Sequence, residues 1–187
     1  MNTRHICGVD EVGRGTLAGP VVASAVILQK NHNIEGLNDS KKLSVKNREL
    51  LFPLIIESSM SVGISIVDSQ IIDKLNIKRA TLLAMKNAVL DLTIKPDIVL
   101  VDGLDKIDIN IPNENIIKGD SKVDCIMAAS IIAKVKRDDL MKKYSNKYPE
   151  FGFEKNKGYG TKFHLNALKK IGPSPIHRMT FKPIKKK

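Results

Sequence analysis

The chain has 187 residues, 42% of them hydrophobic, and a formal net charge of +11. This length and composition fit one domain with a sizeable core, and they exclude a chain that is disordered throughout. No apolar run reaches the roughly 18 residues of a membrane span, and carboxylates stand where a signal peptide would be apolar. We therefore expect a cytoplasmic protein with no membrane partner. Cys7 and Cys125 lie far apart and fit reduced core thiols rather than a disulfide or a zinc site.

The excess positive charge is confined to the C-terminal quarter. Residues 1–141 hold 18 Lys+Arg and 18 Asp+Glu, whereas residues 142–187 hold 13 basic and 2 acidic residues. Six of the eight Phe and Tyr residues lie among these lysines, between positions 144 and 163. Cations interleaved with flat rings suit the phosphates, sugars and bases of nucleic acid. The pattern predicts a polyanionic partner, although the terminal KPIKKK fits a solubilising tail equally well.

The predicted elements alternate between strands and helices. In chain order we predict strands at 5–12 and 20–28, a helix at 44–57, a strand at 60–67, helices at 69–76 and 78–91, strands at 97–102 and 115–118, and helices from 122 to about 144 and at 161–171. Ser44 is the expected N-cap of the first helix, and Ser121 with Asp124 forms a capping box for the long one. The stretch after Pro149 is expected to be loop-like. This order predicts an α/β fold with a mixed sheet flanked by helices.

Four carboxylates stand where ligands gather in α/β proteins. Asp10 and Glu11 lie near the end of the first predicted strand. Asp102 ends the buried strand DIVLVD, and Asp120 in KGDSK precedes the long helix. Strand ends and helix starts collect ligands in open sheets, and a carboxylate at the end of a buried strand needs a partner. Singly, Asp102 fits a turn residue and Asp120 a helix N-terminal charge.

Together the four carboxylates predict a metal-dependent nuclease. Mg²⁺ prefers carboxylate oxygens and water, and two such ions can clamp the oxygens of a phosphodiester displacement. Neighbouring side chains on a strand point to opposite faces, so Asp10 and Glu11 share a site only if the strand bends or ends there. Gly13 permits such a bend. Asp10 is therefore the safer ligand of the two.

Other readings of the glycine-rich turn fit less well. The spacing of GRGTLAG is one residue too long for a dinucleotide-binding loop, and a strand rather than a helix follows it. The chain has no P-loop and no G-x-S-x-G, and its four histidines, at 5, 32, 164 and 177, are scattered. A non-catalytic nucleic-acid-binding module explains the basic charge but not the carboxylates.

Six short stretches, in a fixed order, point to one known family. They are DEVGRG at 10–15, LNDSKKLS at 37–44, VDG at 101–103, KGDSK at 118–122, AASIIAKVKRD at 128–138 and GYGTKFH at 158–164. With these stretches the chain resembles ribonuclease HII, a type 2 ribonuclease H, over nearly its whole length, as far as HRMTFKP at 177–183.

This resemblance implies a ribonuclease H-like fold with a small helical C-terminal extension. It implies an endonuclease that cleaves the RNA strand of RNA–DNA hybrids and nicks duplex DNA 5′ of embedded ribonucleotides, leaving 3′-hydroxyl and 5′-phosphate ends. The implied cofactors are two Mg²⁺ or Mn²⁺ ions, held by Asp10, Glu11, Asp102 and Asp120. The expected enzyme is a monomer, and recruitment by a sliding clamp is not readable from the sequence. A junction resolvase of the same fold and a catalytically silent hybrid-binding protein remain as alternatives.

The resemblance also implies substrate contacts. The turn Gly13–Arg14–Gly15 would read the 2′-hydroxyl through its backbone, because glycines let a backbone approach the sugar closely. Tyr159 would pack on the sugar beyond the ribonucleotide and sense the RNA-to-DNA junction. The expected phosphate contacts are Ser40, Lys41, Ser121 and Lys122. Residues 1–144 would form the catalytic domain, and 145–187 a basic segment of loop plus helix that contributes to substrate binding.

A few positions depart from the family's pattern. Thr16 stands where proline is usual, which predicts a less rigid turn. Cys125 and Met127 interrupt a run of small residues on the long helix, and the larger side chain of Met127 is expected to require space in the core. Arg137 and Asp138 are expected to be structural, and a DNA-gripping helix beyond residue 172 is expected to be missing or reduced.

Overall fold

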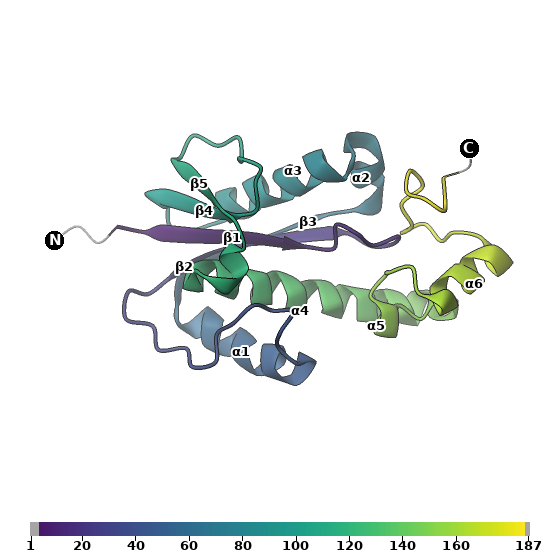
Figure 1. Ribbon diagram of the computed structural model, residues 1–187, viewed down its shortest axis with the longest axis horizontal. Coiled ribbons are helices and arrows are strands. Elements are labelled where there is room, and N and C mark those ends of the chain that lie inside the picture. Colours follow the sequence, from purple (N-terminus) through teal and green to yellow (C-terminus); the bar gives the residue numbers. More distant parts are fainter. Residues whose placement is uncertain (1–3, 186–187) are drawn as a thin grey trace.

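A five-stranded mixed sheet forms the centre of the computed structural model, which describes residues 4–185 (Figure 1). From edge to edge, the strands are β3 (Ser59–Val67), β2 (Val21–Leu28), β1 (Ile6–Val12), β4 (Ile98–Asp102) and β5 (Asn113–Ile116). β1, β2 and β3 pair antiparallel, whereas β4 runs parallel to β1 and β5. The expected mixed sheet is confirmed, and its parallel half brings the C-terminal ends of β1 and β4 side by side.

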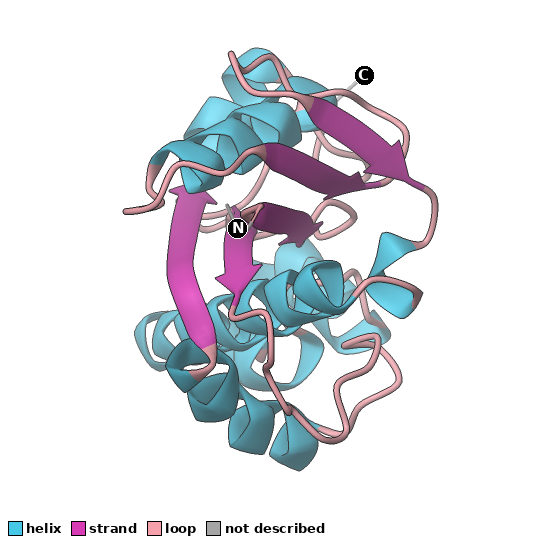
Figure 2. Cartoon of the chain, turned by 90° about the vertical axis from the view of Figure 1, so that its left-hand side faces the viewer, coloured by secondary structure: helices cyan, strands magenta, loops and turns pink. Residues whose placement is uncertain are grey.

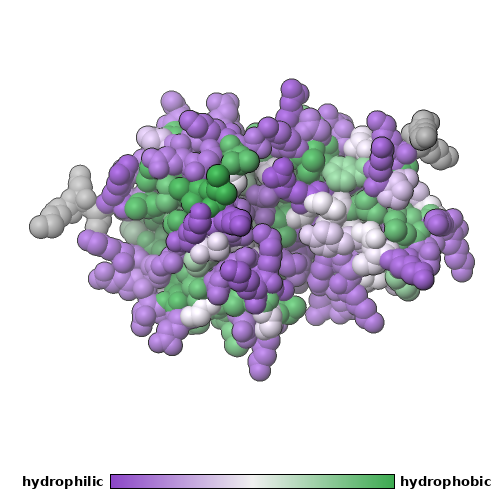
Figure 3. Space-filling model, in the orientation of Figure 1, coloured by the Kyte–Doolittle hydropathy of each residue, from purple (hydrophilic) through white to green (hydrophobic). Residues whose placement is uncertain are grey.

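Helices cover both faces of this sheet. In chain order they are α1 (Val45–Glu57), α2 (Ser69–Leu75), α3 (Ile77–Leu90), α4 (Asp124–Lys147), α5 (Phe153–Asn156) and α6 (Lys162–Ile171), with 3₁₀ turns at Gly119–Ser121 and Pro149–Phe151. Figure 1 shows α2 and α3 above the sheet and α1 and α4 below it, and Figure 2 shows the strands between these two helical layers. α5 and α6 extend the molecule beyond the sheet and form the expected helical extension. Hydrophilic side chains cover most of the face seen in Figure 3.

Small residues let the helical layers approach the sheet closely. Ala25 of β2 packs in the core on the α3 side, whereas its neighbour Val26 packs with α1 and α4. A Cβ on Gly8 of β1 would lie 2.2 Å from the backbone of Cys125, so α4 crosses β1 in direct backbone contact. Asp10 is two residues beyond Gly8, so its side chain points to the same face, toward α4.

The start of the long helix differs from the prediction. α4 begins at Asp124, with Val123 at the N-cap and no side-chain cap, so the capping box predicted for Ser121 is wrong. The residues before it form a 3₁₀ turn, in which the Ser121 hydroxyl donates to the carbonyl of Lys118. This turn buries Asp120, which a regular helix beginning one turn earlier would place differently.

Two other boundaries also differ. β5 lies two residues earlier than predicted, because pairing with β4 matches Val99 to Asn113 and sets its register. The stretch after Pro149 is not a plain loop, since it holds a 3₁₀ turn and α5. The division proposed at residue 144 falls inside α4.

Most of the C-terminal aromatic rings build a small core of their own. Phe151 and Phe153 are buried, and the partly buried Tyr144 and Tyr148 pack against the same cluster. The rings of Phe151 and Phe153 stack on each other, with their centroids 5.3 Å apart. The prediction that the flat rings of this stretch contact nucleic acid is therefore wrong for the two buried phenylalanines. Exposed side chains remain at Tyr159 and at Phe163.

Several smaller expectations can be compared with the described residues. Cys7 and Cys125 are free and buried, as expected. Met127 is only partly buried, so it does not demand room in the core. Between α6 and residue 185 the chain forms no further helix. Across residues 4–185, no helix combines the length and apolarity that a membrane span requires.

Candidate functional site

Three of the four predicted carboxylates meet at the C-terminal ends of β1 and β4. Asp10, Asp102 and Asp120 each offer an oxygen, and these oxygens lie within 4.8 Å of one another. They come from β1, from the last residue of β4 and from the 3₁₀ turn before α4. The pairing of β1 with β4 stops at Val9, so the carboxylates lie just beyond the last paired residues. Residues separated by more than a hundred positions thus form one acidic cluster.

Burial and mutual repulsion make this cluster electrostatically unfavourable. Burial raises the pKa of Asp10 well above its usual range, and the charges of Glu11 and Asp102 add to the effect. Burial also raises the pKa of Asp102, and the charge of Asp120 contributes, although the backbone N–H of Gly119 donates to its Oδ1 at 2.7 Å. Carboxylates crowded in this way favour a bound cation.

One lysine partly compensates the acidic charge. The Nζ of Lys41 donates to Oδ2 of Asp120 at 3.0 Å. Burial by itself lowers the pKa of Lys41. The hydrogen bond to Asp120 and the charges of Asp120 and Asp10 outweigh this effect, so the pKa of Lys41 is raised. One ammonium group thus faces three carboxyl groups, so Lys41 compensates only part of the negative charge that the cluster carries when ionised.

Glu11 lies beside the cluster rather than within it. β1 stays regularly paired with β2 through Glu11 and Val12, so the strand does not bend between Asp10 and Glu11. The Glu11 carboxylate faces Arg14 at 3.6 Å, while the Glu11 N–H donates to Oδ1 of Asp10 at 2.7 Å. Burial raises the pKa of Glu11, Arg14 opposes this shift, and the charge of Asp102 reinforces it. Glu11 is thus within electrostatic reach of the cluster, and its role as a ligand stays a prediction.

The glycine-rich turn after β1 is held by two buried arginines. Arg178 donates to the carbonyls of Gly13, Arg14 and Gly19. Arg137 donates to the carbonyl of Pro20 and to the hydroxyl of Thr16 at 2.9 Å. Arg137 is therefore structural, as expected, and the turn is fixed from both sides.

Thr16, which stands where the family usually has proline, is hydrogen-bonded within this turn. Its side chain is fully buried, and its hydroxyl donates to the carbonyl of Gly13 at 3.1 Å while it accepts from Arg137. The hydrogen bonds supply the restraint that a proline ring would otherwise give. The effect of Thr16 on the rigidity of the turn stays a prediction, and Arg137 of α4 supplies a hydrogen bond that compensates for the missing proline ring.

The two glycines of this turn have different structural roles. Gly13 has a φ of +98°, and a Cβ there would lie 2.2 Å from Nε of Arg137, so the fold itself requires glycine. A Cβ on Gly15 would meet no protein atom within 4 Å. The protein has no internal need for glycine at position 15, where the missing side chain leaves the backbone open to a ligand.

The loop that carries Tyr159 lies directly against this turn. Leu17 donates its N–H to the carbonyl of Gly158 at 2.8 Å. Gly158 has a φ of +88°, and a Cβ there would lie 2.4 Å from the carbonyl oxygen of Ala18. Tyr159 follows with a half-exposed side chain. Both elements expected to read the substrate therefore share one surface.

Comparison with known proteins agrees with this geometry. The family model described as "Ribonuclease HII" matches residues 7–184. A protein named Ribonuclease HII from Endomicrobium trichonymphae is 53% identical over 180 residues, covering 96% of this chain and 86% of that protein. The chain belongs to the ribonuclease HII family. Its members are endoribonucleases that act on RNA–DNA hybrids.

Solved structures of the family share the fold. Ribonuclease H2 from Pyrococcus horikoshii OT3 superposes with a TM-score of 0.81 at 30% identity, covering 96% of this chain and 94% of that one. The RNase HII of a PCNA complex from Archaeoglobus fulgidus also gives 0.81, at 26% identity, covering 98% of both chains. The ribonuclease H-like fold expected from the resemblance is therefore confirmed.

The predicted phosphate contacts of this ribonuclease HII chain differ in their surroundings. Ser40 is buried, and its hydroxyl pairs with that of Ser130 at 2.7 Å. Ser121 and Lys122 use their polar atoms locally, with Nζ of Lys122 donating to the carbonyl of Ile117 at 2.8 Å. Lys41 lies against Asp120. Contacts from these four residues to phosphate stay a prediction.

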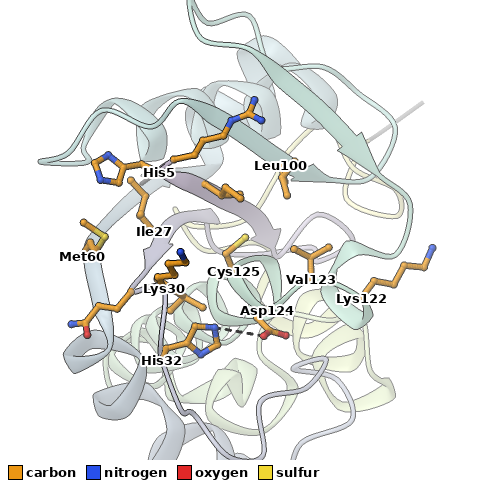
Figure 4. Close-up of a pocket in the computed structure, with 14 residues that line it drawn as sticks. His5, Ile27, Lys30, His32, Met60, Leu100, Lys122, Val123, Asp124 and Cys125 are labelled. Atoms are coloured by element: carbon orange, nitrogen blue, oxygen red, sulfur yellow. Dashed lines mark ion pairs between the residues drawn. The ribbon is translucent and has the colours of Figure 1, made fainter. Parts of the chain in front are cut away.

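A larger hollow lies at the opposite end of β1 (Figure 4). It has a volume of about 990 Å³, and His5, Lys30, Met60 and Cys125 are among the residues that line it. None of the four carboxylates lines this hollow. A much smaller one of about 20 Å³ lies between Arg14 and Asp102, so the turn faces the acidic cluster. The four carboxylates of this ribonuclease HII chain thus lie outside its large hollow, although Lys122, one of the predicted phosphate contacts, lines the hollow.

Sequence reasoning missed three side chains that support the site. Arg178, His164 and His177 are buried behind the glycine turn and the Tyr159 loop. Their only signal was their presence in the stretches GYGTKFH and HRMTFKP. The histidines, described as scattered along the sequence, include one pair that the fold brings into contact.

Proposed function

We propose that this chain incises duplexes on the 5′ side of ribonucleotides and cleaves the RNA strand of RNA–DNA hybrids, leaving 3′-hydroxyl and 5′-phosphate ends. The observation that carries the proposal is the convergence of Asp10, Asp102 and Asp120 within 4.8 Å, beside a rigid turn with an open glycine. A cluster of carboxylates alone is nonspecific, whereas its placement next to a backbone surface suits a nucleic-acid strand.

The donor set fits Mg²⁺ or Mn²⁺. Its donors are carboxylate oxygens, which these hard cations prefer, and their crowding is relieved by positive charge. In the proposal Asp10, Asp102 and Asp120 hold two ions together with Glu11, which would give up its contact with Arg14. When bound, such ions supply Lewis acidity that favours attack by water and departure of the 3′-oxygen.

The chain's own residues would orient the substrate. The backbone at Gly13–Arg14–Gly15 would contact the 2′-hydroxyl, the one group that marks RNA at a given nucleotide. The exposed ring of Tyr159 would pack on the next sugar, and the basic segment 145–187 would attract the phosphates. Support for this arrangement comes from the open space at Gly15 and from the shared surface of the turn and the Tyr159 loop.

The proposed enzyme acts as a monomer without a membrane partner. A sliding clamp belongs among the partners to be tested, because the Archaeoglobus relative occurs in a structure with PCNA. Sedimentation of the purified chain measures its oligomeric state, and sedimentation with a clamp measures that interaction.

One substrate tests the proposed function directly. A DNA duplex with a single embedded ribonucleotide is incubated with the protein in Mg²⁺ or in EDTA. Nicking on the 5′ side of the ribonucleotide, in Mg²⁺ only, is expected. Cutting of an all-DNA four-way junction instead would indicate a resolvase, and binding without cutting would indicate a silent hybrid-binding protein.

Asp102→Asn makes the test specific to the acidic cluster. The variant should bind a hybrid nearly as well as the wild type but should not cut it, because only the metal-binding charge is removed. Full activity at saturating Mg²⁺ would contradict the metal assignment.

A further inference from the structure

Two buried histidines meet behind the Tyr159 loop. His164 lies on α6, and His177 lies in the segment that follows it. Both side chains are almost fully buried, and their Nε2 atoms lie 2.9 Å apart. The rings of Phe151 and Phe153 pack against both of them. None of these four side chains has a role in the proposed chemistry.

The hydrogen-bond partners determine the tautomer of each ring. Nδ1 of His164 lies 2.8 Å from the carbonyl oxygen of Tyr159, which can only accept, so Nδ1 carries the proton. Nε2 of neutral His164 is then an acceptor, and His177 must donate from its own Nε2. Nδ1 of His177 accepts from the N–H of Ser174 at 2.9 Å. The chain Ser174–His177–His164–Tyr159 therefore has one direction, and every ring nitrogen has a partner.

A proton added to His164 would bring two N–H groups face to face between the rings. A proton added to Nδ1 of His177 would end its contact with the Ser174 N–H and turn it into a donor toward the hydroxyl and carbonyl oxygens of Ser174, at 2.9 and 3.3 Å. Burial lowers the pKa of both histidines, and the charge of His164 further lowers that of His177. The neighbours that face the pair are the two phenylalanine rings, the hydroxyl of Ser174 and the backbone of Tyr159 and Ser174, none of which carries a charge. The neutral, directed form is the one that this environment stabilises.

The histidine chain joins the segments that form the substrate-facing surface. Leu17 donates to the carbonyl of Gly158, and Arg178 donates its N–H to the carbonyl of Leu17 at 2.9 Å. Gly19 donates to the carbonyl of Ile176 at 2.9 Å. These bonds join the Tyr159 loop to the glycine turn, and the glycine turn to the segment 174–178. The contacts of His177 with His164, and of His164 with the carbonyl of Tyr159, join that segment back to the Tyr159 loop and complete a closed ring.

We propose that His164 and His177 act as positioning residues for the reaction. Their hydrogen-bond chain holds the backbone of Tyr159 at a set place relative to the Gly13–Arg14–Gly15 turn. This spacing determines how well the chain recognises a single ribonucleotide followed by DNA, compared with continuous RNA–DNA hybrid. The inference rests on the proposed function of Tyr159 and names the residues that set its selectivity.

Variants of His177 separate positioning from simple packing. His177→Gln keeps an N–H donor near the position of Nε2, whereas His177→Leu keeps bulk but donates nothing. His177→Leu should lower the ratio of single-ribonucleotide incision to hybrid cleavage about tenfold, the effect of losing one buried hydrogen bond. His177→Gln should restore the ratio to within about threefold of the wild type. Both kcat and KM are measured on the two substrates, and His32→Gln, in the hollow at the opposite end of β1, serves as the control with an unchanged ratio.

Equal loss on both substrates in His177→Leu would overturn the proposal, because it would mean that the pair only supports the fold. If His177→Leu does not fold, His164→Asn replaces it. Asparagine can still donate to the carbonyl of Tyr159 but cannot accept from His177, so the same change in ratio is expected.

Nitrogen-15 NMR of the two imidazoles supplies a readout independent of activity. At neutral pH it should show an Nδ1–H tautomer for His164 and an Nε2–H tautomer for His177. The opposite tautomers, or charged rings, would overturn the hydrogen-bond chain. A wild-type protein that shows these tautomers but does not cut the single-ribonucleotide duplex would instead overturn the proposed function, so the two failures are distinguishable.

Discussion

Replacing Asp10 by asparagine should stabilise the metal-free protein while it abolishes activity. The carboxylate oxygens of Asp10, Asp102 and Asp120 lie within 4.8 Å of one another. At that distance two unit charges repel by about 3.5 kcal/mol if the effective dielectric constant is about 20. The asparagine side chain removes this repulsion and keeps an oxygen that can accept the N–H of Glu11.

The measured gain should be smaller than the full Coulomb energy. Lys41 already offsets part of the repulsion through its contact with Asp120. We expect Asp10→Asn to raise the free energy of unfolding by about 1–3 kcal/mol at pH 8 in EDTA. For a chain of this size, that gain corresponds to a rise in Tm of about 3–10 °C.

Calorimetry with and without Mg²⁺ tests both halves of this prediction. Wild-type protein should gain stability as Mg²⁺ is added, because ligand binding favours the folded state, whereas Asp10→Asn should gain much less. Asp108→Asn, at a fully exposed carboxylate, is the control and should change neither Tm nor nicking. The reasoning would be refuted if Asp10→Asn had a lower Tm than the wild type in EDTA, or if Mg²⁺ raised the Tm of Asp10→Asn as much as that of the wild type.

Three further predictions concern the glycine turn and the histidines. Gly15→Ala should unfold at the wild-type temperature, because the added Cβ meets no protein atom within 4 Å. It should lose single-ribonucleotide nicking, because the Cβ would occupy the space proposed for the substrate. A lowered Tm would show that the fold needs this glycine. Thr16→Val, which removes both hydroxyl hydrogen bonds, should cost about 1–3 kcal/mol in urea unfolding, and an unchanged midpoint would argue against the restraint described above. The pKa of His177 is lowered from 6.5 to about 4, so the unfolded chain binds more protons between these pH values. The free energy of unfolding therefore includes the full contribution of neutral His177 above pH 6.5, and it falls by at most about 3 kcal/mol as the pH is lowered toward 4. Urea midpoints should therefore decline more steeply with acid in the wild type than in His177→Gln.

The difference between sequence prediction and structure is clearest at α4. Its existence follows from helical spacing, but its start does not, because the 3₁₀ turn before it is shaped by the burial of Asp120 next to Asp10 and Asp102. Capping rules describe local hydrogen bonds, and here a contact between distant segments overrides them. The same limit applies to Phe151 and Phe153, whose spacing among lysines does not reveal that they pack on each other.

The sequence by itself determined the mixed α/β class, the acidic residues that converge and the family, because these depend on periodicity and on short ordered stretches. It could not determine which side chains meet. That His164 contacts His177, and that Arg178 reaches the carbonyl of Gly13, depends on how the C-terminal segment folds back across the start of the chain. Contacts of this kind, made between separate segments, leave no periodic trace in the sequence. The acidic cluster was therefore predictable from local signals, whereas the contacts of His164, His177 and Arg178 that support the site were decided by tertiary packing.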